Sequence, residues 1–391
     1  MGSARLINIR QAMEKEGLEL LICRNPENVL YLTGYWPITG WSLAFLPLEG
    51  EPVLIVPVSE LEYAKDGWVK DIRPYEGEGL NEVWNPYKVI SKALEELKHH
   101  KYVKIGCELS FETVATNSIV GEVNYASVPT FKMLHKVFEA ELVDASRIIV
   151  KLRSVKSEYE IEKMKLSAKL ASLAIEKLLK NVSEGVKEST LASVVEATVY
   201  SEGVGFENKV KRARGFAFVM SGENTSKAWY PFNISTDRRI RRGDVILLEL
   251  NVCADGYWVD ITRTWVLGKP SSEQEAIYYT VLEAQEEVYR FEYDGVEASS
   301  VDEAARSLIA RKGFSKFFPH RLGHGVGLRI HEAPTLHPTS RDILRRNTTH
   351  TVEPGVYTDK FGMRLEDVVI VQDRGVKNLF EKYKTLSLKT F

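Results

Sequence analysis

Two apolar runs near the middle of the chain, at residues 245–253 and 257–267, constrain the fold most strongly because each carries an acidic residue. An Asp-Gly pair separates them, and Asp-Gly readily adopts the positive φ angles of a tight hairpin turn. The register set by this turn places Asp260 opposite Asn251 and makes Glu249 its diagonal neighbour on the same face. Acidic residues are usually solvated, but the apolar neighbours of Glu249 favour burial. A buried carboxylate needs a cation, a hydrogen-bond donor or a proton, so we expect such a partner beside this hairpin.

A second predicted pair of strands, at residues 349–358 and 363–371, has the same character. A hairpin between them places Glu353 opposite Glu366, although the Pro-Gly that follows Glu353 must distort the ladder. Arg364 lies two residues before Glu366 and therefore on the same strand face. An internal salt bridge between the two explains this pattern as well as metal ligation does, so both interpretations remain open.

Three histidines, His320, His324 and His331, lie in one short segment between the two predicted hairpins, and glycines flank His324. Glycine has no side chain, so the backbone can approach a site closely there. Imidazole suits borderline metals such as zinc and cobalt. An isolated histidine is more often a hydrogen-bonded polar residue than a ligand, but three in one glycine-rich segment favour ligation. No Gly-x-Gly-x-x-Gly joins a strand to a helix here, which argues against nucleotide binding.

The length of 391 residues favours two domains. Residues 1–150 alternate short apolar runs with amphipathic helices, which is typical of an α/β domain. Residues 151–391 begin with long helical patterns and continue with paired strands, and we expect the boundary between Val143 and Ser154. The predicted strands of the first region are Leu18 to Cys23, Glu51 to Val58 and Tyr102 to Cys107, and its predicted helices are Leu6 to Glu16 and Pro86 to Leu97, the second capped by Asn85. The predicted helices of the second region are Ser157 to Leu179, Glu188 to Ser201, Glu273 to Glu292 and Ser300 to Lys312.

Composition narrows the function classes. The 52 basic and 54 acidic side chains nearly cancel, so we expect no recruitment of nucleic acid. The three cysteines fit neither a disulfide framework nor a thiolate zinc site, and the first residues lack the apolar run of a secretory signal; both indicate a cytoplasmic protein. The uncharged stretch from Asn28 to Leu48 contains prolines and glycines, so we interpret it as buried strands and turns, not as a membrane helix.

With these residues, the sequence resembles the creatinase/prolidase/methionine aminopeptidase superfamily over nearly the whole chain. Four blocks carry the resemblance: Gly243 to Thr264, Gly323 to Glu332, Glu353 to Tyr357, and Arg364 to Asp367. The resemblance implies an α/β N-terminal domain of the creatinase/prolidase type at residues 1–150 and an α+β pita-bread catalytic domain at residues 151–391. The N-terminal domain favours the prolidase and aminopeptidase P branch and implies a homodimer.

The resemblance also implies a reaction centre with two divalent metal ions per chain: manganese, cobalt or zinc. Five ligands are implied: Glu249, Asp260, His324, Glu353 and Glu366. In this family a bridging water or hydroxide attacks the scissile carbonyl and the metals polarise it, which implies that Glu353 shuttles the proton. His331 matches the histidine that steadies the tetrahedral intermediate, and His320 matches a further outer-shell histidine. Three residues are expected on the substrate side: Arg364, Trp229 and Tyr257.

The sequence departs from the family pattern at several positions. Glu249 stands where the first ligand is usually Asp, and its extra methylene displaces the carboxylate enough to weaken or remove one metal. Trp229 occupies the place of a substrate-side histidine. A second specificity arginine has no clear match, with Arg341 as a weak candidate. His350 stands where the family usually has small or apolar residues, and we interpret it as an edge-strand side chain in preference to an added ligand.

The leading hypothesis is a metal-dependent hydrolase that cleaves Xaa-Pro peptide bonds in small peptides, as an Xaa-Pro dipeptidase or aminopeptidase. An alternative is a creatinase-like or ectoine-hydrolase-like enzyme that cleaves a C–N bond in a non-peptide substrate, with an altered or absent metal site; Trp229 and Glu249 motivate it. A third hypothesis is a non-catalytic pita-bread binding module, which predicts degraded ligand positions. The retained ligand pattern ranks this third hypothesis last.

Overall fold

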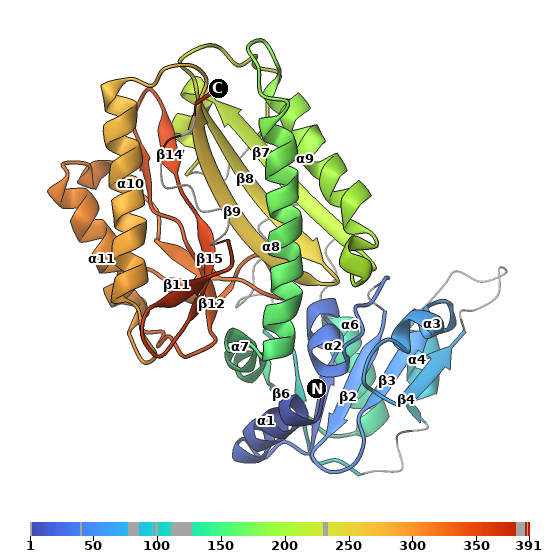
Figure 1. The fold of residues 1–391 in the computed structure, drawn as a ribbon. Helices are drawn as coiled ribbons and strands as arrows, with labels where there is room; N and C mark the ends of the chain where they lie inside the picture. The colour runs from blue at the N-terminus through green and yellow to red at the C-terminus, as the bar shows by residue number, and fades with distance from the viewer. Residues whose placement is uncertain are drawn as a thin grey trace. The chain divides into compact units, whose positions relative to one another are not determined.

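The computed structural model describes residues 2–39, 41–76, 86–95, 97, 101–110, 127–229, 234–380, 388 and 390–391. The chain divides into two compact units, Met1–Arg153 and Ser154–Phe391. Figure 1 colours the first unit from blue to blue-green and the second from green to red. No helix in the described part of the chain is both long and apolar enough to cross a membrane.

The first unit is built on a six-stranded sheet with the order β4-β3-β2-β1-β5-β6. Its strands are β1 (Leu20–Cys23), β2 (Leu43–Pro47), β3 (Val53–Pro57), β4 (Asp71–Tyr75), β5 (Lys104–Cys107) and β6 (Glu141–Asp144). Its helices are α1 (Gly2–Lys15), α2 (Pro26–Thr33), α3 (Leu61–Ala64), α4 (Pro86–Glu95), α6 (Val128–Phe138) and α7 (Ser146–Ser154). The three predicted strands and both predicted helices are present, which confirms the α/β pattern. Asn85, the predicted cap of α4, lies outside the described residues.

The prediction for residues 28–48 is wrong at its start. Strand β2 lies in this stretch as expected, but α2 occupies residues 28–33. Pro26 sits in the first helical turn, where its missing N–H costs no hydrogen bond. Gly34 ends the helix in the left-handed conformation, with φ of 76°, and its N–H donates to the Leu30 carbonyl. The strand prediction depended on the prolines and glycines of the stretch, but Pro26 and Gly34 start and end a helix.

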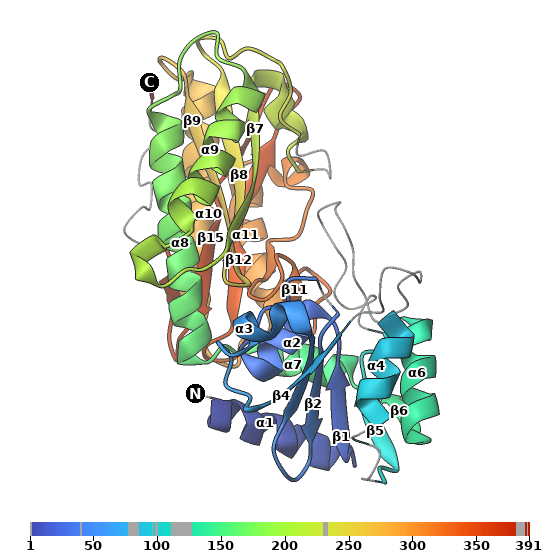
Figure 2. The ribbon, with the colours of Figure 1, turned by 90° about the vertical axis from the view of Figure 1, so that its right-hand side faces the viewer.

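The second unit begins with two helices that pack on a three-stranded antiparallel sheet of order β7-β8-β9. These elements are α8 (Glu158–Leu179), α9 (Glu188–Gly203), β7 (Ala213–Ser221), β8 (Val245–Ala254) and β9 (Tyr257–Val266). Figure 2 shows α8 and α9 along one face of this sheet. Ser157 and Glu160 form a reciprocal capping box that starts α8 where the sequence predicts it.

The rest of the second unit packs against β8 and β9. A five-stranded sheet has the order β11-β10-β12-β15-β16, and β13 pairs with β14 beside it. The strands are β10 (Gly323–Gly325), β11 (Glu332–Leu336), β12 (Thr349–Val352), β13 (Gly355–Tyr357), β14 (Gly362–Arg364), β15 (Asp367–Val371) and β16 (Val376–Asn378). Helices α10 (Ser272–Phe291) and α11 (Ala298–Arg311) bury their apolar faces against these strands. Strands β14 and β15 contact β8 and β9, which brings the two predicted hairpins together.

Candidate metal centre

The first hairpin has the predicted register. Asp255 and Gly256 have φ angles of 50° and 89°, and Asn251 pairs with Asp260. The Asn251 amide donates to Asp260 Oδ1 at 2.5 Å, which confirms that both side chains lie on one face. Glu249 and Asp260 are 8% and 1% exposed, so this hairpin buries two carboxylates.

The second pair of strands keeps one register across an interruption. Gly355 pairs with Arg364 in β13 and β14, and Val352 pairs with Asp367 in β12 and β15. Glu353 and Glu366 lie in the gap between these ladders, where the neighbouring proline has no N–H to donate. Their own amides bond elsewhere: Glu353 N donates to the Leu322 carbonyl and Glu366 N to the Thr262 carbonyl. The interrupted ladder therefore ties both carboxylates to the histidine segment and to the first hairpin.

The glycines around His324 are required by close backbone packing. A Cβ atom at Gly323 would lie 2.0 Å from the Thr351 carbonyl oxygen, and one at Gly325 would lie 2.0 Å from the Ala333 carbonyl oxygen. His324 is consequently held between β11 and β12 and is 2% exposed, and its backbone N–H donates to Thr351 Oγ1 at 3.1 Å. The sequence prediction that these glycines permit close approach is confirmed.

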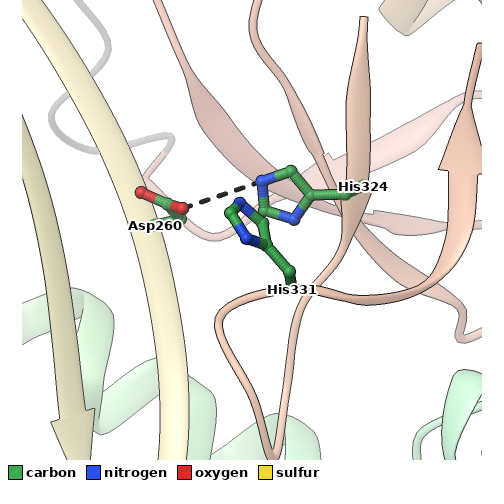
Figure 3. A group of neighbouring side chains, drawn as sticks. All are labelled: Asp260, His324 and His331. Carbon is green, nitrogen blue, oxygen red and sulfur yellow. Dashed lines mark ion pairs between the residues drawn. The ribbon is translucent and has the colours of Figure 1, made fainter. Parts of the chain in front are cut away.

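The imidazoles of His324 and His331 lie edge to face, with ring centroids 4.0 Å apart. Figure 3 shows the Asp260 carboxylate reaching from its strand toward these two rings. His324 Nε2 is 3.7 Å from Asp260 Oδ2 and 3.4 Å from Glu353 Oε1. Donor atoms from two strands, β9 and β10, and from the connections that hold His331 and Glu353 therefore converge on a small volume.

The potential ligand atoms form three overlapping groups, and within each group the atoms lie within 4.8 Å of one another. The groups are Asp260 with His324 and His331, His324 with Glu353 and Glu366, and Glu249 with Asp260 and Glu366. The structure thus brings all five predicted ligands together, and it adds His331, which the sequence analysis placed beside the metals. Nitrogen and oxygen donors in this mixture suit zinc, manganese or cobalt.

The charges of the cluster favour the binding of cations. Burial and neighbouring carboxylates raise the pKa of Asp260 and Glu366 well above their usual range, and burial raises the pKa of Glu353 to about 7. Burial lowers the pKa of His324 well below its usual range and that of His331 to about 4, so both stay neutral, the form that binds metal. Within the described residues, buried Glu366 Oε1 has no hydrogen-bond partner. A divalent cation fits this donor set, because it would satisfy that oxygen and neutralise the carboxylates.

Arg364 is buried beside the cluster, and its guanidinium contacts other groups of the protein on several sides. Its guanidinium forms an ion pair with Glu249 and donates to Thr262 Oγ1, Tyr357 Oη and the Ala228 carbonyl, each of the last three at 2.9 Å. Of the two interpretations left open for Glu366, the salt bridge with Arg364 does not form, because Arg364 pairs with Glu249 instead. Burial opposes ionisation of Glu249, but Arg364 and Thr262 lower its pKa, so Glu249 remains a carboxylate.

The other predicted site residues differ in how they lie relative to the cluster. His320 Nε2 lies 3.1 Å from Tyr357 Oη, and burial lowers the pKa of His320 to about 3. Trp229 is 40% exposed and directly follows Ala228, whose carbonyl binds Arg364. Tyr257 is not brought to the cluster: it packs edge to face on Tyr159 of α8, on the sheet face opposite Asp260.

The interpretation of His350 as an edge-strand side chain is wrong. Strand β12 lies between β10 and β15, and His350 is fully buried with Nε2 3.2 Å from Glu292 Oε2. Burial opposes its charge, but Glu292 prevails and raises the pKa of His350. Strand order is decided by long-range packing, so the local pattern around His350 could not reveal it.

Sequence reasoning missed the hydroxyl and guanidinium groups that support the cluster. Thr262 Oγ1 lies 2.6 Å from Glu249 Oε2 and 2.7 Å from Glu366 Oε2, and it can donate to one of them at a time. Thr351 Oγ1 lies 3.2 Å from Glu353 Oε1. The predicted register already placed Thr262 opposite Glu249, so that signal was available. The position of Thr351 depends on the tertiary fold.

The fold and the cluster define a metal-dependent hydrolase with an N-terminal α/β domain and a pita-bread catalytic domain, which confirms the predicted fold class. Two family models match the chain: "Metallopeptidase family M24" over residues 162–373 and "Creatinase/Prolidase N-terminal domain" over residues 5–155. The chain belongs to metallopeptidase family M24, whose members use divalent metal.

Relatives and solved structures agree with this assignment. The chain is 29% identical over 384 residues to the Xaa-Pro dipeptidase of Pyrococcus furiosus, covering 98% of this chain and 99% of that protein. It is 31% identical over 381 residues to the Xaa-Pro dipeptidase of Pyrococcus horikoshii, covering 97% of each. The crystal structure of the Pyrococcus horikoshii prolidase superposes with a TM-score of 0.77 at 28% identity, over 97% of this chain and 98% of that one. The Xaa-Pro dipeptidase of Bacillus anthracis superposes with a TM-score of 0.82 at 25% identity, over the full length of both.

Proposed function

We propose that this chain hydrolyses the Xaa-Pro bond of small peptides with two divalent metal ions, manganese, cobalt or zinc. The observation that carries the proposal is the convergence of four carboxylates and two neutral imidazoles, all of them buried except Glu353 and His331, which are partly buried. We assign as ligands Glu249, Asp260, His324, Glu353 and Glu366. The relatives named as Xaa-Pro dipeptidases support the substrate class and do not favour the non-peptide or non-catalytic alternatives.

When bound, the metal ions supply Lewis-acid polarisation of the scissile carbonyl and activation of the attacking water. Glu353 would hold metal through its carboxylate and lies beside the place of that water, so it can accept a proton from the water and return it to the leaving nitrogen of proline. His331 is neutral, so its ring N–H can donate to the developing oxyanion. Arg364 is 4% exposed and bonded on several sides, so we propose that it positions Glu249 and does not touch the substrate.

Metal dependence and substrate class can be tested together. Purified protein stripped with a chelator and reconstituted with manganese, cobalt or zinc should hydrolyse Leu-Pro and Met-Pro. Glu353→Gln should lower kcat by about 10²-fold or more, because the proton acceptor is lost. The matched control is Glu273→Gln on the exposed side of α10, which should leave kcat unchanged. Absence of turnover by the wild-type protein with every metal would remove the proposal.

We further propose that the protein is a cytoplasmic homodimer that binds neither nucleic acid nor membrane, as the family resemblance and the balanced charge indicate. Light scattering coupled to gel filtration measures the mass in solution directly. A mass near 44.4 kDa, that of one chain, would contradict the dimer.

A further inference from the structure

A buried ion pair lies at the end of the loop that carries His331. Lys156 Nζ is 2.8 Å from Glu332 Oε1, and the two side chains are 2% and 4% exposed. Removing two charges from water is costly, so a buried ion pair often stabilises a fold no more than apolar residues of similar volume would. The segments that this pair holds together therefore explain it better than the stability that it adds.

Lys156 is fixed by the backbone around it. Its N–H donates to the Asn347 carbonyl at 2.9 Å, and Val155 forms an antiparallel bridge with Thr348, directly before β12. Its ammonium group also donates to the Ser154 carbonyl at 3.4 Å. The positive charge is thus anchored beside the start of the strand that leads to the metal cluster.

The other partner, Glu332, directly follows His331 and begins β11. The loop that leads to His331 folds onto the ion pair at Gly327. A Cβ atom at Gly327 would lie 2.7 Å from Glu332 Oε1 and 2.7 Å from Lys156 Cε. The Gly327 carbonyl accepts a hydrogen bond from the Trp258 N–H at 2.6 Å, which ties the loop to β9. The ion pair therefore packs against both the beginning and the end of this loop.

The His331 imidazole has few other constraints. It packs edge to face on His324, with ring centroids 4.0 Å apart (Figure 3). Within the described residues, no hydrogen bond holds its ring nitrogens. Its orientation therefore depends on the position of the loop backbone. A displacement of about 1 Å would take the ring off His324 and misplace its N–H relative to the developing oxyanion.

We propose that the Lys156–Glu332 ion pair positions His331 against His324 and thereby maintains the rate of the hydrolytic step. This inference rests on the proposed Xaa-Pro hydrolysis, in which His331 donates to the oxyanion. Lys156 and Glu332 are positioning residues, because they act through His331. Loss of the pair should lower kcat and leave KM nearly unchanged, since the displaced N–H acts in the transition state and not in substrate binding.

A double variant separates positioning from stability. Lys156→Met should lower the melting temperature because buried Glu332 loses its cation, and Lys156→Met/Glu332→Gln should recover most of the loss because it removes both charges. On Leu-Pro with manganese, we expect kcat to fall roughly 10- to 100-fold in both variants, with KM changed by less than about twofold. The control Lys169→Met removes a more exposed ion pair, with Glu207, and should leave kcat unchanged. Wild-type kcat in the double variant would overturn the proposal.

NMR spectroscopy of His331 separates this inference from the proposed function, because it requires no turnover. In zinc-loaded protein with isotope-labelled histidine, the His331 ring resonance is identified by its loss in His331→Gln. The adjacent His324 ring shifts this resonance, so its chemical shift reports how the two rings pack. We expect the shift to change in Lys156→Met and in the double variant, but not in Lys169→Met.

The two readouts have distinct consequences. An unchanged His331 shift in the double variant overturns the positioning role, whatever the activity. If the shift changes but the wild-type protein does not hydrolyse Leu-Pro with any metal, the result counts against the proposed function alone.

Discussion

Metal binding to the cluster should release protons, because three of the carboxylates that would hold the metal have raised pKa values. Three carboxylates, those of Glu249, Asp260 and Glu366, are buried beside the guanidinium of Arg364, and the partly buried carboxylate of Glu353 joins them. Arg364 cannot balance four negative charges there, so part of the cluster must be protonated when metal is absent. Metal ligands bind in the deprotonated form, so loading the site displaces these protons.

The direction of the effect follows from the individual groups. Asp260 and Glu366 have pKa values raised well above their usual range, so they hold protons more readily than exposed carboxylates do. Glu353, with a pKa of about 7, is half-protonated at pH 7 and contributes about half a proton. Glu249 has a lowered pKa and contributes none. We expect release of protons when the metal positions fill, and apparent metal affinity that rises with pH.

Calorimetry measures this release directly. Manganese is titrated into metal-free protein at pH 7 in phosphate and in Tris, and the difference in apparent enthalpy between buffers gives the number of protons released. Glu353→Gln should reduce the number by about half a proton, because glutamine does not titrate. Glu273→Gln on the exposed side of α10 should not change it. Equal enthalpies in both buffers, or affinity independent of pH, would refute the argument that the carboxylates hold protons in the metal-free protein.

Three further predictions concern single positions. Glu249→Asp withdraws the carboxylate from Arg364 by about one bond length, which should increase the number of tightly bound metal ions per chain, measured by elemental analysis. No increase would contradict competition between Arg364 and metal. His350→Leu should lower the free energy of unfolding of the metal-free protein in urea by about 3–5 kcal/mol, because buried Glu292 loses its ion-pair partner. The double variant with Glu292→Leu should recover most of the loss, and equal instability of the two variants would exclude an ion pair between these residues. Gly323→Ala should cost at least about 1–3 kcal/mol and weaken metal binding, because its Cβ would clash with a neighbouring carbonyl; wild-type stability would contradict the close approach.

The predictable part of the site is the part that local chemistry determines. An Asp-Gly turn fixes the register of β8 and β9, so the facing of Asn251 and Asp260 follows from sequence alone. The register around Glu353 and Glu366 follows in the same way, and the proline accounts for its interruption. In both cases a short loop and a period of two suffice to place the side chains.

The remaining part depends on contacts between segments far apart in the chain. A salt bridge between Arg364 and Glu366, two positions away, was one of two interpretations, but the fold gives Arg364 a partner 115 positions away. His350 was assigned to an edge because nothing in its neighbourhood specifies that β10 and β15 flank its strand. Local patterns do not encode these long-range choices.

The extra methylene of Glu249 has consequences beyond the loss of ideal ligand geometry. A carboxylate that is already paired with Arg364 is less available to a cation, so the two metal positions should differ in affinity. At the position served by His324, Glu353 and Glu366, Arg364 Nε lies 3.9 Å from Glu353 Oε2, a longer ion pair than the one it forms with Glu249, and Glu366 Oε1 has no hydrogen-bond partner within the described residues. This position should fill first. The first ion brings two positive charges and displaces no more than about that many protons, so the second ion gains no extra attraction and still competes with Arg364 for Glu249. Two unequal binding steps, and not two equivalent ones, are therefore the expected signature of this chain.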